Sequence, residues 1–261
     1  MKKISEFQSS LRFLLTDIDD TLTDDGQLGG PAYQALWDLA AKGIKVIPIT
    51  GRPAGWCEMI ARQWPVAGVV GENGGFYFRY HDKKMHRDFY YDEKIQIQNR
   101  LRLDALQEKI LKEVPGCEVA SDQFCRLMDL AIDFCEDVPA LPHSEVQKIV
   151  RIFEAEGAQA KISSIHVNGW FGDYNKLTMT LRMLFKEFGI SETDAKKVVG
   201  FSGDSPNDEP MFAYFPHSFG VANLQKFAST LKNKPTYIAD KKGGEGFVQI
   251  AQALLTFQKN T

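Results

Sequence analysis

The sequence lacks the features that would place the protein in a membrane, on nucleic acid or in an oxidising compartment. Its 261 residues include only four cysteines, with no CxxC spacing and no histidine at the spacing of a zinc site. No apolar run approaches the roughly 18 residues of a membrane span, and residues 1–13 do not resemble a signal peptide. The net charge is −3 without a basic tract, so neither nucleic acid nor a membrane is expected as a partner. We therefore expect a cytoplasmic protein, and its oligomeric state stays open.

The composition is that of an ordinary globular protein. Hydrophobic residues make up 44% of the chain and charged residues 25%, and no internal repeat or low-complexity tract interrupts it. A chain of this length forms one large domain or two of modest size.

The most informative stretch is residues 11–23, LRFLLTDIDDTLT, where an apolar run ends in three carboxylates. Residues 13–15 predict a short buried strand, and Asp17, Asp19, Asp20 and Thr21 follow at its carboxyl end. Open α/β sheets bind their ligands at that edge. Because clustered carboxylates repel one another, the stretch favours a cation site; taken alone, it also fits a polar turn that caps a helix.

Strands and helices alternate on both sides of a central region. Before it, the pattern predicts strands at 13–15, 44–49 and 66–70 with helices at 31–42 and 54–64; after it, a helix at 176–188, strands at 198–202 and 219–222 and a helix at 247–255. This alternation is typical of a doubly wound parallel sheet.

The central region has a different rhythm. Helices are predicted at 95–112 and 143–156, and strands at 124–128, 130–134 and 160–167. Because these elements come in blocks, we predict an inserted α+β domain at 82–168 within a Rossmann-like core formed by 1–81 and 169–261.

Polar residues follow several of the predicted core strands. They comprise Asp17, Asp19 and Thr21 in the first loop, Thr50, Gly51 and Arg52 in the second, Lys176 at a helix start, and Asp204, Asn207 and Asp208 in the last. Since parallel strands point the same way, these groups are expected to converge on one crevice.

The residue types suit phosphoryl transfer. One carboxylate can attack phosphorus, and a second, two residues on, can protonate the leaving oxygen and later deprotonate water. A hydroxyl, backbone N–H groups and a lysine can bind the phosphoryl oxygens. A distant aspartate can complete a magnesium site made of hard oxygen ligands.

The segments DIDDTLT, PITGRP, the later lysine and GDSPND resemble, in order, the four motifs of the haloacid dehalogenase-like phosphatases. The position of the insertion corresponds to the large α/β cap of that superfamily. The segment GENGG at 71–75 is similar to an element of this cap subclass, which includes many sugar phosphatases.

The resemblance implies a role for each matched residue. Asp17 would be the nucleophile and a Mg²⁺ ligand, Asp19 the general acid and base with its backbone carbonyl on the metal, and Asp204 a further metal ligand. Phosphate would be bound by Thr50, Gly51, Lys176 and Asn207. Thr21 would order the first loop, and Asp208 would orient Lys176 or a metal-bound water.

The sequence departs from the family pattern at two places. Asp20 stands where glycine is common, and it is interpreted as a bystander. The third motif often reads DKGxA, whereas this chain has Asn175-Lys176-Leu177, so the choice of Lys176 rests on its position at a helix start. Lys161 and Lys186 are poorer candidates.

Several polar residues receive no firm role. Arg52 can bind substrate or pair with an acid, and Glu72 and Asn73 can belong to a tight turn. His166 and Asn168 can line the pocket or pack at the junction with the insertion.

The resulting hypothesis is a Mg²⁺-dependent phosphomonoester hydrolase with a phosphoaspartate intermediate. The resemblance implies a small phosphorylated metabolite as substrate, in particular a sugar phosphate or a phosphoglycerate-linked sugar. The alternatives are a sugar phosphomutase on the same core and a catalytically silent binding module, although a silent module has no need of Asp17, Asp19 and Asp204 together.

Overall fold

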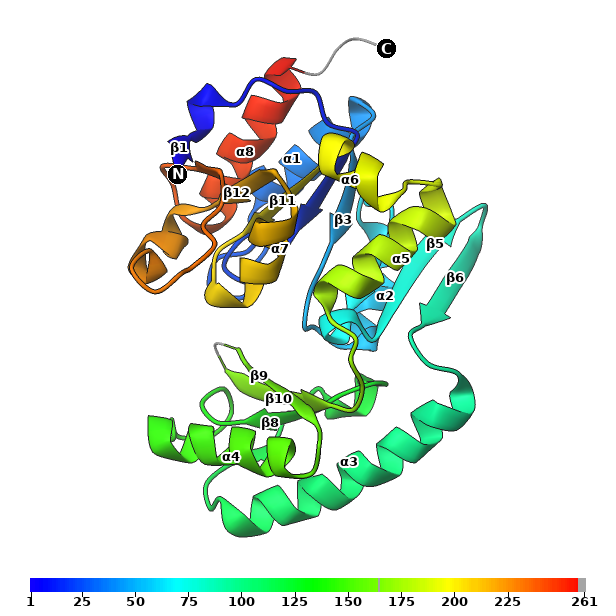
Figure 1. Ribbon diagram of the computed structural model, residues 1–261, viewed down its shortest axis with the longest axis vertical. Coiled ribbons are helices and arrows are strands. Elements are labelled where there is room, and N and C mark those ends of the chain that lie inside the picture. Colours follow the sequence, from blue (N-terminus) through cyan, green and yellow to red (C-terminus); the bar gives the residue numbers. More distant parts are fainter. Residues whose placement is uncertain (164, 258–261) are drawn as a thin grey trace.

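The core of the protein is a parallel sheet of six strands. The computed structural model describes residues 1–163 and 165–257 (Figure 1). The strands lie in the order β1 (Lys2–Lys3), β13 (Tyr237–Ile238), β12 (His217–Gly220), β11 (Val199–Gly203), β2 (Phe13–Thr16) and β3 (Lys45–Pro48). Every neighbouring pair in this order is parallel. The predicted strand that ends at Asp17 is therefore β2, in the interior of the sheet.

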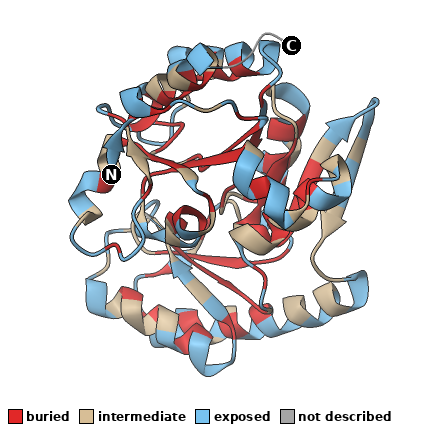
Figure 2. Ribbon diagram, turned by 45° about the horizontal axis from the view of Figure 1, so that its top comes forward, coloured by how far each residue is buried: buried red, intermediate tan, exposed pale blue. Residues whose placement is uncertain are grey.

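Helices cover both faces of this sheet. Leu14 and Val46 pack into the cluster formed with α1 (Gly30–Ala41) and α8 (Gly243–Phe257). Leu15 and Ile47 point the other way, toward α5 (Lys176–Phe188), α6 (Glu192–Val198) and α7 (Glu209–Tyr214). Buried residues accordingly concentrate in the central strands and on the inner helix faces (Figure 2). The predicted doubly wound parallel core is confirmed.

A second, antiparallel sheet extends the core beyond β3. It consists of β4 (Val69–Gly71), β5 (Phe76–His81) and β6 (Lys84–Phe89), and a parallel bridge from Ile49 to Val70 joins it to the end of β3. Phe76 and Phe78 stack and pack with α2 (Ala54–Gln63). Residues 84–89 thus belong to a hairpin that extends the core.

The remaining elements form a cap with a hydrophobic core of its own. Its antiparallel sheet has the order β7 (Glu118–Val119), β8 (Leu130–Asp133), β10 (His166–Trp170) and β9 (Gln159–Ile162). Figure 1 shows α3 (Glu93–Glu113) and α4 (His143–Ala155) on the side of this sheet that faces away from the core. The inserted α+β cap is as predicted, whereas the domain limits at 82 and 168 stay a prediction.

Two of the strands predicted in the cap are wrong. The segment 124–128 contains the end of a short helical turn, η3 (Gln123–Cys125), and no strand. The segment 160–167 is two strands, because β9 turns back at Ser163, whose backbone N–H bonds to His166 O, and pairs with β10. Apolar alternation alone does not mark such a tight turn.

The chain crosses between core and cap at a cluster of four aromatic side chains. Tyr90 and Tyr91 lie on the way into the cap, and Trp170 and Tyr174 on the way out; their rings contact one another across the two connections.

Within the described ranges, 1–163 and 165–257, no helix is both long and apolar enough to cross a membrane.

Candidate active site

Three strand ends meet at one edge of the parallel sheet. The register places Thr16 of β2 beside Ser202 of β11 and Pro48 of β3. The N–H of Asp17 donates to Ser202 O at 2.9 Å. The residues that follow these strands therefore start from the same edge, where the sequence predicted a crevice.

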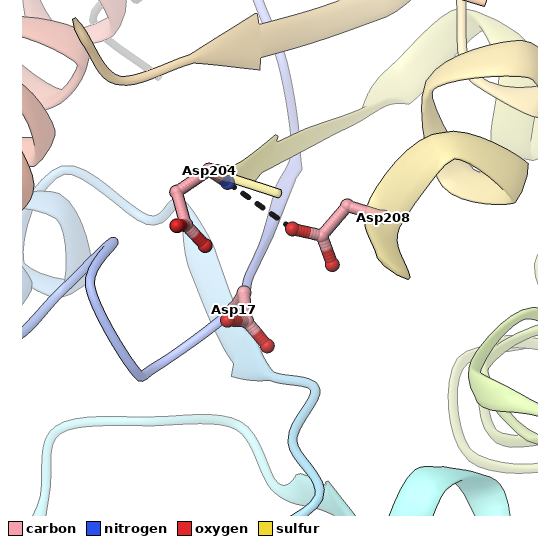
Figure 3. Close-up of side chains that lie close together, drawn as sticks. All are labelled: Asp17, Asp204 and Asp208. Atoms are coloured by element: carbon pink, nitrogen blue, oxygen red, sulfur yellow. Dashed lines mark hydrogen bonds between the residues drawn. The ribbon is translucent and has the colours of Figure 1, made fainter. Parts of the chain in front are cut away.

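Three buried aspartates gather at this edge (Figure 3). One carboxylate oxygen of each of Asp17, Asp204 and Asp208 lies within 4.8 Å of those of the other two. Asp208 comes from the turn η4 (Pro206–Asp208), and its Oδ2 accepts from the N–H groups of Asp204 at 3.1 Å and Ser205 at 3.4 Å. Thr21 donates through Oγ1 to Asp204 Oδ1 at 3.4 Å, so the first loop also contacts the cluster.

Lys176 places its ammonium group against these carboxylates. It is the first residue of α5, whose N-cap Asn175 accepts from the Thr178 N–H at 3.0 Å. Lys176 Nζ lies 2.6 Å from Asp17 Oδ1 and 3.3 Å from Asp208 Oδ1. The two alternative lysines lie elsewhere: Lys161 is on β9 of the cap, and Lys186 pairs with Asp88.

The cluster holds more negative charge than its buried setting favours. Burial, followed by repulsion from Asp208, Asp204 and Asp19, raises the pKa of Asp17 well above its usual value despite Lys176. Burial and the nearby carboxylates of Asp208 and Asp20 raise the pKa of Asp204 to about 7. Burial opposes the charge on Lys176, but Asp17 and Asp208 outweigh it and raise the lysine pKa. A bound cation would relieve this repulsion, and carboxylate oxygens are the hard donors that suit Mg²⁺.

Asp19 lies at the mouth of the site and is paired with Arg52. The guanidinium of Arg52 contacts Asp19 Oδ1 at 2.7 Å through Nη2 and at 3.1 Å through Nε. Arg52 also stacks on Trp56, with its guanidinium carbon 4.4 Å from the ring centroid. The Asp19 side chain keeps 36% of its surface exposed, so it is accessible to a substrate in the crevice.

The other predicted phosphate-binding residues lie on different parts of the site. Gly51, Lys176 and Asn207 line the crevice. Thr50 is fully buried, and its Oγ1 accepts from the Arg52 N–H at 3.0 Å. Asn207 donates through Nδ2 to Ile162 O at 2.9 Å and thereby links the core to β9 of the cap.

The crevice lies between core and cap and has a volume of about 590 Å³. Its cap side is polar, with Arg126, His143, Lys161, Ser163, His166 and Asn168 among the lining residues. Pockets of this size accommodate small metabolites. His166 and Asn168, for which the sequence left two interpretations open, thus belong to the crevice wall.

The sequence did not identify a buried network beside this wall. Arg126 donates to Gly51 O at 3.1 Å and forms ion pairs with Asp122 and Asp129. Asp129 in turn accepts from Asn168 Nδ2 at 3.0 Å. The spacing of Arg126 and Asp129 carries no motif, so only the fold reveals that they meet Gly51.

Comparisons with known proteins agree with this geometry. A family model described as haloacid dehalogenase-like hydrolase matches residues 14–103. Phosphoglycolate phosphatase of Methanospirillum hungatei is 27% identical over 245 residues, which are 92% of this chain and 95% of the relative.

Solved structures show the same fold over nearly the whole chain. A protein of Thermoplasma acidophilum superposes with a TM-score of 0.74 at 18% identity, covering 94% of this chain and 98% of the other. The sucrose-phosphatase of Synechocystis, solved with sucrose and phosphate, gives a TM-score of 0.64 at 17% identity, with 95% and 98% covered. With the motif residues assembled at one sheet edge under a cap, the chain is similar to the haloacid dehalogenase-like hydrolases over residues 14–103, and relatives that match 90% of the chain or more are phosphoglycolate phosphatases.

Proposed function

We propose that the protein hydrolyses a small phosphomonoester in a Mg²⁺-dependent reaction through a phosphoaspartate at Asp17. The observation that carries this proposal is the contact of the buried Asp17 carboxylate with Lys176 beside Asp204 and Asp208, on the floor of the crevice. A carboxylate placed beside a fixed cation can receive an anionic phosphoryl group without uncompensated repulsion.

In the first step a carboxylate oxygen of Asp17 forms a bond to phosphorus while the bond to the leaving oxygen breaks. Asp19, two residues on, gives its proton to that oxygen. In the second step Asp19 takes a proton from water, which attacks the phosphoaspartate and releases phosphate, so Asp17 is regenerated. Arg52 forms an ion pair with Asp19, and the same guanidinium can bind the anionic phosphoryl group of the substrate.

Asp17 and Asp204 are the residues best placed to hold the metal ion. Both oxygens of Asp208 are already engaged, one by Lys176 and the other by the backbone N–H groups of Asp204 and Ser205. Asp208 therefore orients Lys176 and the Asp204 loop. When bound, Mg²⁺ supplies positive charge that stabilises the phosphoryl oxygens in the transition state.

The cap wall favours a polar, negatively charged substrate. Lys161, Ser163 and Asn168 provide a cation and hydrogen-bonding groups opposite the catalytic floor. The relative from Methanospirillum hungatei is named for phosphoglycolate, and sugar phosphates also fit a crevice of about 590 Å³. We therefore place the substrate among small phosphorylated hydroxy acids and sugars, including phosphoglycerate-linked sugars.

The test is phosphate release from a panel of these compounds with and without Mg²⁺. Asp17→Asn should lower kcat by more than about 10³-fold because it removes the nucleophile. Asp38→Asn, on the exposed face of α1, is the matched control and should keep wild-type rates. Wild-type protein quenched during turnover should carry one phosphoryl group on the peptide that contains Asp17.

Two results would contradict the proposal. An unchanged rate in Asp17→Asn would exclude this residue as the nucleophile. With a hexose 1-phosphate and a trace of the bisphosphate, isomerised product without free phosphate would identify a phosphomutase instead.

A further inference from the structure

The loop GENGG between β4 and β5 has a left-handed backbone at two residues that are not glycine. Glu72 has a φ of 43° and Asn73 a φ of 56°, both in the left-handed region. The Glu72 side chain is also fully buried. Asparagine adopts this region readily, whereas a left-handed φ at glutamate raises the free energy of the folded state and persists where surrounding contacts hold it.

The Glu72 carboxylate accepts hydrogen bonds from both the core and the cap. Oε1 accepts from the N–H of Ala54, at the start of α2, and from that of Leu127, each at 2.9 Å. Oε2 accepts from the N–H groups of Met128 and, at 3.1 Å, Asp129. Residues 127–129 lie outside any helix or strand. Three successive backbone N–H groups of the cap therefore donate to one carboxylate of the core.

The two segments that Glu72 joins both lead to the crevice. On the core side, the Glu72 N–H donates to Arg52 O at 3.2 Å and the Asn73 N–H to Thr50 O at 3.1 Å. On the cap side, residues 127–129 continue the segment whose Arg126 donates to Gly51 O. Asp129 of the same segment holds Asn168 on the crevice wall.

We propose that Glu72 is a positioning residue that fixes the cap segment 126–129 on the loop at Thr50 and Gly51, and so sets the distance between the phosphate site and the crevice wall at Asn168. This inference rests on the proposed function, since it concerns the same crevice. Glu72 does not line the crevice and acts through Gly51 and Asn168.

The electrostatics of Glu72 fit a positioning role. Burial, and next the carboxylate of Asp129, raises the pKa of Glu72 to about 7 although backbone N–H groups oppose the rise. The raised pKa shows that burial of this carboxylate is costly, and its hydrogen bonds to backbone N–H groups offset part of that cost. Its geometry, with N–H donors from two domains, accounts for its presence.

The first experiment measures amide hydrogen exchange in the full-length protein. Glu72→Gln keeps the shape but turns an N–H donor group toward the backbone donors, so exchange at Leu127, Met128 and Asp129 should accelerate by at least about tenfold. Glu72→Asp keeps the charge and shortens the reach by one methylene group, and it is measured in parallel in case one variant fails to fold. Glu187→Gln is the matched control, because Glu187 is near the C-terminal end of α5 and accepts hydrogen bonds from Tyr77 and Arg79 within the core.

The second experiment separates positioning from general destabilisation by comparing two substrates. For the best substrate of the panel, Glu72→Gln should lower kcat/KM on the order of tenfold, mainly through KM, because the crevice wall is displaced. The kcat/KM for acetyl phosphate, whose leaving group offers little for the cap to bind, should decrease much less in the same variant. In Glu187→Gln the ratio of kcat/KM for the two substrates should equal that of the wild type.

Unchanged exchange at 127–129 in the Glu72 variants, or an equal loss on both substrates, would overturn the inference. The exchange measurement does not require catalysis. An absence of phosphatase activity in the wild type would therefore reject the proposed function, and hydrogen exchange would still decide whether Glu72 holds residues 127–129.

Discussion

At the scale of single residues, the position of Lys176 determines the charge balance of the site. Its Nζ lies between Asp17 and Asp208, at 2.6 Å and 3.3 Å from their nearest oxygens. These two carboxylates and that of Asp204 would otherwise face one another in a buried space. An ammonium at this point neutralises the nucleophile and also attracts the phosphoryl group.

Replacing this lysine should therefore inactivate the enzyme. We expect Lys176→Met to lower kcat on the order of 10²-fold or more, because the phosphoryl oxygens lose a fixed positive partner. The measurement is phosphate release at saturating Mg²⁺. Lys186→Met removes a lysine from the same helix, where it pairs with Asp88 on the surface, and should keep activity. Equal rates in the two variants would contradict the assignment.

The structure also explains one departure from the family pattern. Asp20 has a φ of 58°, in the left-handed region where glycine is unstrained. Aspartate is among the few other residues that adopt this conformation readily. The backbone therefore accommodates Asp20 in place of the glycine that the resemblance led us to expect.

At the scale of elements, the loop GENGG and the start of α5 are packed against each other. Gly74 has a φ of 108°, and a Cβ atom there would lie 2.2 Å from the backbone oxygen of Asn175. Asn175 is the N-cap of the helix that begins with Lys176. The loop thus packs against the N-terminus of α5 and holds Lys176 in position.

We expect Gly74→Ala to displace the start of α5 and to lower both stability and activity. The backbone strain alone costs about 1–3 kcal/mol, and the clash adds to it. Gly157→Ala is the matched control, because Gly157 has a φ of 77° with open space around its Cβ position. Chemical unfolding and kcat measure the two effects. A wild-type kcat in Gly74→Ala would show that the loop does not position Lys176.

The sequence predicted elements well where the information is local. The helix at 176–188 has the same limits as α5, because an amphipathic stripe and an N-cap residue define it within its own segment. The strand predicted at 124–128 is wrong because the backbone donors at 127 and 128 bond to Glu72, more than fifty residues away. Local preference cannot indicate such a partner.

The same division holds for the candidate site. The rule that parallel strands share a carboxyl edge was enough to bring Asp17, Thr50 and Asp204 to one place. The chemical roles of these residues stay predictions until variants are assayed. Arg126 and Asp129 were not predicted, because tertiary contacts alone bring their cap segment to Gly51.

At the scale of the whole molecule, the buried acids of the site make the stability of the folded protein depend on pH. Unfolded aspartate ionises near pH 4, whereas burial and neighbouring carboxylates hold the pKa of Asp204 at about 7 in the folded protein. Between these values the folded state binds more protons than the unfolded state, so stability falls as the pH rises. Glu72, with a pKa of about 7, contributes in the same direction.

Without Mg²⁺, the midpoint temperature of thermal unfolding should therefore decrease as the pH is raised from 5 to 8. Mg²⁺ requires ionised ligands, so its stabilising effect should be larger at pH 8 than at pH 6. At a concentration a hundred times the dissociation constant it should add about 2.7 kcal/mol. Thermal unfolding with and without Mg²⁺ at the two pH values measures this, and Asp204→Asn should lose most of the Mg²⁺ effect. A shift of equal size at both pH values would contradict the prediction.

The aromatic cluster at the two connections gives the protein an intrinsic optical probe. Trp170 is 3% exposed and donates through Nε1 to Tyr174 O at 3.3 Å, while Trp37 and Trp56 are 50% and 41% exposed. The emission of a shielded indole is blue-shifted relative to that of exposed ones, and its quenching depends on nearby rings and carbonyl groups. Because Trp170 stacks on Tyr174 at the connection between cap and core, a change in its fluorescence would report a change in the packing of this junction without an added label.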